Sequence, residues 1–298
     1  MKRDDFKVLM DSKLIEITSY NKVIWKADPK LDTQYNKIRD YALTDNLFCS
    51  NNTAFVWNFP AKVFKQFKEV YILTYMFDGQ LQKYYYDLHF IKYDYYGIVR
   101  DEAGRYSLTP KSEVEEDRAY FKRLINIYEG KLNDVGNKKT SLSSSWFTNA
   151  YNKDNVSTLR KNLKNYFANI TQSSSDAFMW TCYSEFTGKL KGNGYSTGTS
   201  KKDQEKHIIG CYTPFNIRAT NDYRHKTNMA YCVNRYMNPL EANFFTQYNV
   251  TVDQDLLALS DLLQWLYRSA IREGQAINLY IPSSRMRQLL RAWLDNEI

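Results

Sequence analysis

The stretch ALSDLLQWLYRSAIREGQAINLYIPSSRMRQLL, residues 258–290, decides the fold that we expect for this chain. Its first half repeats apolar residues at the spacing of an amphipathic helix, and Gly274 follows where that helix should stop. INLYI, at 277–281, predicts a buried strand. Pro282 and the two serines after it predict the start of a last helix that ends near Trp293. The first hundred residues also alternate predicted strands and helices, which favours an α/β protein.

The same stretch carries a set of polar side chains that suits an anion. Gln264, Arg268 and Arg272 are four residues apart, so we expect them to share one face of the first helix. Arg285 and Arg287 fall in the first turn of the next helix, where the helix dipole disfavours cations unless an anion is near. Guanidinium groups match phosphate oxygens well, and the set therefore predicts a phosphate site. A solvated polar stripe on an amphipathic helix is the simpler alternative for the first three residues.

The composition indicates a globular protein with an anionic partner. Of 298 residues, 43% are hydrophobic and 16% aromatic, and 41 Lys and Arg oppose 33 Asp and Glu. The net charge of +8 favours nucleic acid, although it would also serve solubility alone. The four cysteines lack paired spacing and the three histidines lie near no cysteine pair, so we expect reduced thiols and no metal site. No apolar run is long enough to cross a bilayer, so we expect no membrane partner.

Several short motifs are set aside because of their context. Residues 194–198 match G-x-S-x-G, but the polar flanks lack the strand and helix of a nucleophile elbow, so a hydrolase using Ser196 is disfavoured. The pair Asp101-Glu102 resembles a metal-binding motif, but a hairpin turn is the better interpretation of its context. The sequence contains no G-x-x-x-x-G-K-[ST] loop and no G-x-G-x-x-G, which are the common loops that bind nucleotide phosphates.

Local patterns along the chain predict alternating strands and helices before the C-terminal stretch. Strands are expected at 21–25, 53–59, 70–73, 90–93, 177–182 and 208–212, and helices at 61–67, 81–88, 112–128 and 156–170. The helix at 156–170 is basic and carries Arg160, Lys161 and Lys164. Residues 229–237 are apolar enough for a core strand or a core helix, and their periodicity does not decide between the two.

Several segments together resemble a known class of proteins. QWLYRSAIREG and INLYIPSSRMR are similar to C-terminal segments of helicase-like proteins of bacteriophages and prophages, and to the last motif of superfamily-two DEAD/DEAH helicases, Gln-x-x-Gly-Arg-x-x-Arg. FKEVYILTYMFDG, SSSWF, FMWTCYS and FNIRATNDY extend the resemblance over most of the chain. It implies an α/β fold made from the back portion of a helicase. The expected domains are a partial first RecA-like lobe (1–111), a helical insert or connector (112–172) and a second RecA-like lobe with a parallel sheet (173–298).

The resemblance also implies roles for individual residues. Thr74 takes the place of the hydroxyl residue of the third helicase motif, although a threonine within a strand explains it equally well. Gln264, Arg268 and Arg272 take the place of the sixth motif, whose arginines reach the γ-phosphate, with Tyr267 where glycine is usual. The fifth motif, which contacts nucleotide and nucleic-acid backbone, falls on Arg218, Thr220, Asn221 and Asp222, for which a polar turn is the alternative. Arg285 and Arg287 would add contacts to nucleic acid.

These expectations lead to two hypotheses about function. The first is a helicase-like, nucleic-acid-binding module of phage or mobile-element origin in the cytoplasm of a bacterial host. It would use ATP and Mg²⁺ only if a partner chain supplied the phosphate-binding loop, because an arginine finger needs a nucleotide held by other groups. The second hypothesis is a non-catalytic protein on a helicase-like scaffold that binds and inhibits a host defence or replication protein. Its tyrosine-rich composition suits a protein interface.

Overall fold

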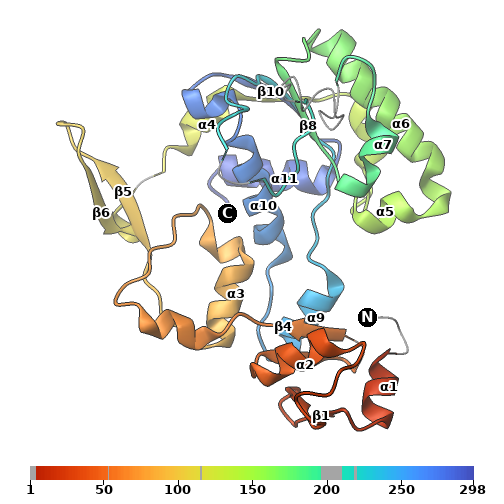
Figure 1. Cartoon of the computed structure of the whole chain (residues 1–298). Helices are drawn as coiled ribbons and strands as arrows, with labels where there is room; N and C mark the ends of the chain where they lie inside the picture. The colour runs from red at the N-terminus through yellow and green to blue at the C-terminus, as the bar shows by residue number, and fades with distance from the viewer. Residues whose placement is uncertain (1–4, 53, 115, 196–209, 218–219) are drawn as a thin grey trace. The chain divides into compact units, whose positions relative to one another are not determined.

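The computed structural model describes residues 5–52, 54–114, 116–195, 210–217 and 220–298, which form two compact units (Figure 1). Unit 1 comprises Met1–Tyr93 and Met237–Asp253, and unit 2 comprises Asp94–Tyr236 and Gln254–Ile298. The boundaries that we expected after residues 111 and 172 therefore differ from those of the structure. Residues 112–172 pack into the unit that holds the parallel sheet, and residues 237–253 join the N-terminal unit.

Unit 1 is built from short elements around a small apolar core. Leu9, Val23 and Leu47 are fully or almost fully buried at its centre. The helix expected near 81–88 is present, and the one expected at 61–67 is a 3₁₀ helix. The elements are α1 (Asp5–Asp11), β1 (Ile15–Ile17), β2 (Val23–Trp25), α2 (Asn36–Leu43), β3 (Leu47–Ser50), β4 (Ala54–Trp57), η1 (Ala61–Gln66), η2 (Phe77–Gly79), α3 (Leu81–Leu88) and α9 (Pro239–Gln247).

The strands of unit 1 are antiparallel, unlike those of the partial first RecA-like lobe that we expected. β1 pairs with β2, and β3 pairs with β4. Asn51 and Asn52 have φ of 50° and 52° in the short turn between β3 and β4, where Ser50 pairs with Ala54. Such a turn joins antiparallel neighbours, so this local geometry excludes a parallel crossover there. Residues 70–73 and 90–93, where we expected strands, are described and form none.

Unit 2 contains a four-stranded, fully parallel sheet, as expected for the C-terminal part of the chain. The strands are β7 (Ile125–Ile127), β8 (Phe178–Thr181), β9 (Asn228–Tyr231) and β10 (Ile277–Tyr280), in the order β7-β10-β9-β8. Leu279 of β10 pairs with Ile127 on one side and with Met229 on the other. Every residue of β8 and β9 is buried, which is typical of a parallel sheet covered by helices on both faces.

The helices of unit 2 cover the sheet on both faces because its crossovers run in both directions. The chain passes from β7 across the sheet to β8 and then returns through β9 to β10, and right-handed crossovers in opposite directions lie on opposite faces. α5 and α6 pack on one side with Trp180 and Tyr280, while α10 and α11 contact each other and α11 contacts α4. These helices are α4 (Arg118–Leu124), α5 (Ser144–Thr148), α6 (Lys153–Asn165), α7 (Thr187–Leu190), α10 (Gln254–Leu266) and α11 (Ser284–Leu294), with 3₁₀ turns η3 (Lys111–Glu113), η4 (Lys131–Gly136), η5 (Ala150–Asn152), η7 (Ser184–Phe186) and η8 (Ala270–Glu273) and the π-helical turn η6 (Tyr166–Ile170).

One helix expected from the sequence is replaced by a helix and a strand. Residues 112–128 were expected to be helical throughout, but α4 ends at Leu124 and β7 follows directly. β7 pairs with β10 about 150 residues later, so its conformation depends on a partner that local sequence does not reveal. Asp101-Glu102 lies in the turn of an exposed hairpin of β5 (Tyr96–Arg100) and β6 (Tyr106–Pro110), as expected. Within the described residues, no helix is both long and apolar enough to cross a membrane.

Candidate functional site

The carboxyl ends of the parallel strands are the first place to look for a ligand site in unit 2. In open parallel sheets, ligands bind outside these ends, where neighbouring strands send the chain to opposite faces. β7 and β10 are such neighbours. Here, however, a Cβ added to Gly136 would lie 1.8 Å from the Pro282 carbonyl oxygen. The loops after β7 and β10 therefore touch through their backbones, and Ser284 Oγ also donates to Asn137 O at 3.2 Å. The two loops that would border a crevice at this switch point are therefore in direct contact.

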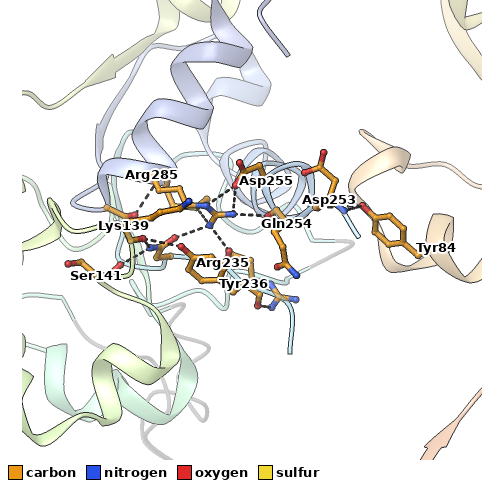
Figure 2. Close-up of polar contacts among 12 residues, drawn as sticks. Tyr84, Lys139, Ser141, Arg235, Tyr236, Asp253, Gln254, Asp255 and Arg285 are labelled. Carbon is orange, nitrogen blue, oxygen red and sulfur yellow. Dashed lines mark hydrogen bonds and ion pairs between the residues drawn. The ribbon is translucent and has the colours of Figure 1, made fainter. Parts of the chain in front are cut away.

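Arg285 occupies the centre of a polar network at the same edge of the sheet (Figure 2). It lies in the first turn of α11, whose N-cap is Ser283, and is only 7% exposed. Its guanidinium stacks on the Tyr236 ring at 4.3 Å. Its hydrogen-bond acceptors are Asp255 Oδ1 (2.8 Å from Nε), Asn234 Oδ1 (3.0 Å from Nη1), the Arg235 carbonyl (2.8 Å from Nη1) and the Gln254 carbonyl (2.8 Å from Nη2).

The network extends from Arg285 into the loop that follows β7. The fully buried Asn234 accepts from Arg285 and donates through Nδ2 to the carbonyls of Lys139 (2.7 Å) and Ser141 (2.8 Å). The anion that the helix dipole requires near Arg285 is thus a carboxylate of the same chain, Asp255. Arg285 joins the segment after β9 to the N-terminal ends of α10 and α11, and its donors bind acceptors of the same chain. The expectation that it contacts nucleic acid is not supported by this geometry.

Arg287 is likewise directed at its own backbone. It is partly buried, and its Nη1 donates to the carbonyls of Ile281 (2.7 Å) and Pro282 (2.9 Å). These bonds secure the turn between β10 and α11. Neither arginine of the α11 first turn is therefore oriented as an open phosphate contact.

The shared helical face expected for Gln264, Arg268 and Arg272 does not form. α10 ends at Leu266, and the chain continues through a turn into the separate 3₁₀ helix η8, which Gly274 ends at φ 72°. Gln264 donates to Ser260 Oγ at 3.0 Å, on its own helix. Arg268 is partly buried in the turn, and Arg272 is exposed in η8. The sequence predicted the stop at Gly274 correctly but missed the earlier end of the helix.

The structure does bring together one residue from each of the two expected helicase-like motifs. Arg272 Nη1 donates to Asn221 Oδ1. Thr220 and Asp222 bond to each other, since the Thr220 hydroxyl donates to Asp222 Oδ2 at 2.7 Å and accepts from the Asp222 amide at 3.2 Å. This is the polar turn that the sequence offered as the alternative. Arg218 lies outside the described residues, as does Ser196.

The five side chains that we grouped as one phosphate site lie at two ends of the sheet. Arg272 precedes β10 and Arg285 follows it, so the strand Ile277–Tyr280 runs between them. Four residues at about 3.3 Å each separate the two positions by roughly 13 Å or more. Arg272 therefore belongs to the amino edge, whereas Arg285 and Arg287 belong to the carboxyl edge. Thr74 lies in unit 1 outside any strand, and its hydroxyl accepts from Gln80 Nε2.

The outer side of α6 is a basic surface of unit 2. Val156, Leu159 and Leu163 face the core. Lys153, Arg160, Lys161 and Lys164 are exposed, and none of them has a recorded ion pair within the part of the chain that the structure describes. At 3.6 residues per turn, Lys153, Arg160 and Lys164 fall within a sector of about 40° around the helix axis. Lys161 lies roughly 60° further round the axis. The sequence identified this helix as basic, but only its packing shows that the cations face solvent.

The charge of the chain is concentrated in the same unit. Unit 2 has 27 Lys and Arg against 20 Asp and Glu, whereas unit 1 has 14 against 13. The net charges are thus +7 and +1. Among the described residues, His, Cys, Asp and Glu form no group of three or more that could hold a metal ion.

Comparison with known proteins identifies relatives of both ends of the chain. Residues 119–294 match the family model described as the YonV C-terminal Rossmann-like domain, and residues 1–57 match the YonV middle domain. The chain is 37% identical over 306 aligned residues to the SPbeta prophage-derived uncharacterized protein YonV of Bacillus subtilis (strain 168). That alignment covers 99% of this chain and 70% of the relative. No solved structure matches the chain.

Proposed function

We propose that this chain binds nucleic acid through its Rossmann-like unit. The chain belongs to the YonV family of prophage proteins and has that family's C-terminal Rossmann-like domain. The observation that carries this proposal is the exposed basic side of α6 on a unit with a net charge of +7. A cluster of Lys and Arg along one helix is the usual footprint of contacts to a phosphate backbone. Such contacts bind without reading sequence and weaken steeply with salt.

The helicase resemblance enters as a second step of the proposal. The contact between Arg272 and Asn221 supports a common role for the two motifs that contain them. Arg272 is exposed and could reach a phosphate held by another molecule. The chain contains no phosphate-binding loop of the common kinds, so we propose that ATP and Mg²⁺ act on this module only when a partner chain holds the nucleotide.

Salt-dependent binding tests the proposal. The affinity of the full chain for fluorescent 30-nucleotide single strands and duplexes would be measured by anisotropy from 50 to 200 mM salt. Removing three phosphate contacts lowers the slope of log K against log salt by about 2 for single strands and about 2.7 for duplexes. We expect this change for the triple variant Arg160→Ala, Lys161→Ala, Lys164→Ala.

A matched variant controls for the loss of three charges as such. Lys7, Lys30 and Lys92 are exposed on unit 1, and replacing all three by alanine lowers the net charge by the same amount. We expect this control to keep nearly the full salt slope. Equal losses in the two variants would show that α6 is not the contact surface. A failure of any oligonucleotide to bind at 50 mM salt would reject nucleic-acid binding and favour a protein partner.

A further inference from the structure

Unit 1 exposes a group of aromatic rings that the sequence did not single out. We call Trp57, Phe59, Phe64 and Tyr85 the aromatic platform. Trp57 and Phe59 are 44% and 46% exposed, although residues of their size are usually covered. Successive rings lie 6.4 Å, 5.7 Å and 6.3 Å apart between centroids, in tilted or edge-to-face arrangements. A cavity of about 350 Å³ opens among them, lined by Phe59, Phe64, Gln82 and Tyr85.

Contacts within unit 1 anchor Phe64 and Tyr85 of the aromatic platform. The Tyr85 hydroxyl donates to the Phe59 carbonyl at 2.6 Å, which ties α3 to the segment before η1. Phe64 packs against the buried Tyr86 ring at 5.3 Å in an edge-to-face arrangement. Gln82 donates to the Tyr86 hydroxyl at 3.2 Å. The rings that line the cavity therefore need little reordering when a flat ligand enters.

Cations flank Phe64 of the aromatic platform along the chain. Lys62 and Lys65 belong to η1 and are exposed, and Lys68 follows at the same three-residue spacing. A 3₁₀ helix has three residues per turn, so Lys62 and Lys65 lie above one another on one face. Glu69, the nearest acid in sequence, accepts from the Tyr71 hydroxyl at 2.6 Å. Within the described residues, no ion pair is recorded for these three lysines.

We propose that the aromatic platform receives unstacked bases of a single-stranded nucleic acid, while Lys62, Lys65 and Lys68 contact the neighbouring phosphates. This inference rests on the proposed function and adds the class of nucleic acid. Aromatic rings beside cations match a ligand that has both π-faces and negative charge, and single-stranded binders combine these same two features. A duplex keeps its base faces stacked and cannot offer them to Phe59 or Trp57. The cavity volume lies at the small end of ligand sites, which suits one base.

The test compares single-stranded with duplex binding in the full chain. Phe59→Ala removes an exposed ring, so we expect the variant to fold and to keep its thermal midpoint. A base-stacking contact is worth about 1–3 kcal/mol, so single-stranded affinity should fall about 5- to 150-fold. Duplex affinity should not change, because the proposed duplex contact lies on α6. Lys62→Ala with Lys65→Ala should weaken single-stranded binding and lower its salt slope by about 1.4.

A second variant separates stacking from apolar contact. Phe59→Leu keeps an apolar side chain of similar bulk but has no π-face, so it should lose most of the affinity that Phe59→Ala loses. If Phe59→Leu binds like the wild type, the platform is an apolar surface of the kind that docks a protein, and the inference is wrong. If Phe59→Ala leaves both affinities unchanged while the α6 variant weakens both, the platform inference fails and the proposed function stands.

A cross-linking experiment locates the contact directly. A single strand carrying 5-iodouracil, irradiated with the full chain, should cross-link to the peptide that contains Trp57 and Phe59. Cross-links confined to α6 would overturn the platform inference and would agree with the proposed function. An absence of all binding, by anisotropy at 50 mM salt, would overturn both.

Discussion

Replacing Arg285 tests whether the network at the carboxyl edge of the sheet is structural. Arg285→Ala removes a donor from three acceptors, which are the buried Asn234 Oδ1 and the partly buried carbonyls of Arg235 and Gln254. Each unsatisfied buried group costs about 1–3 kcal/mol, and breaking a buried pair by removing one partner costs about 3–5 kcal/mol. The Asp255 side chain is 60% exposed and regains water, so we take the lower end. We expect the free energy of unfolding of unit 2 to fall by about 3 kcal/mol.

The measurement is urea unfolding followed by circular dichroism, with hydrogen exchange of β9 and β10 peptides to assign the loss to unit 2. Arg291 of the same helix is the matched control, because its side chain is 46% exposed and its ion pair with Glu129 lies at the surface. Arg291→Ala should cost no more than about 1 kcal/mol. If Arg285→Ala and Arg291→Ala differ by less than about 0.5 kcal/mol, our reading of the network as a buried clamp is wrong.

Three further predictions concern a close backbone approach, a partly buried histidine and ATP. Gly136→Ala should destabilise unit 2 by about 1–3 kcal/mol, because its Cβ would lie 1.8 Å from the Pro282 backbone. Gly188→Ala is the control, since a Cβ there meets nothing within 4 Å, and it should be neutral or stabilising. Thermal unfolding measures both effects. Burial lowers the pKa of His89 below 6.5, so the unfolded chain binds a proton at His89 more readily than the folded chain does. The contribution of His89 to stability should therefore be complete above pH 6.5 and be lost as the pH falls below it. His89→Gln should therefore shrink the drop in melting temperature between pH 7 and pH 5, and an unchanged drop would contradict that assignment. The purified chain should release no phosphate from ATP and Mg²⁺ with or without single-stranded DNA; hydrolysis that survives further purification would overturn the need for a partner chain.

Local sequence was sufficient where one element carried its own start and stop. Ser283 caps α11 by accepting from the Met286 amide, and Gly274 adopts the left-handed conformation that ends η8. The strands β8 and β10 were apparent as short apolar runs, and α3 begins and ends as expected. In each case the signal lies within a few residues of the feature. Such signals depend on backbone geometry and burial, which local residue types control.

Long-range contacts explain the main errors. The apolar spacing of α10 continues to Ala270, which suggested one helix through Arg272. In the structure the Ala270 amide donates to the Lys226 carbonyl at 3.0 Å, a bond from a distant segment that competes with helix continuation after Leu266. β7 depends on β10 in the same way. The aromatic platform was missed because Trp57, Phe64 and Tyr85 come from three different elements, so no local pattern unites them.

The arginines also show why residue type and spacing were a poor guide to an anion site. The dipole argument for Arg285 was correct in requiring an anion nearby. That anion is Asp255, thirty residues earlier in the chain, so the guanidinium of Arg285 is already paired within the fold. Arg272 lies in a short 3₁₀ turn, where it is exposed and donates a hydrogen bond to the neutral side chain of Asn221. An external phosphate competes more easily with an amide at the surface than with the carboxylate and three other acceptors that surround the buried Arg285. Of the sequence-selected arginines that the structure describes, Arg272 therefore remains the best candidate for a phosphate contact, at the amino edge of the sheet rather than at the carboxyl edge.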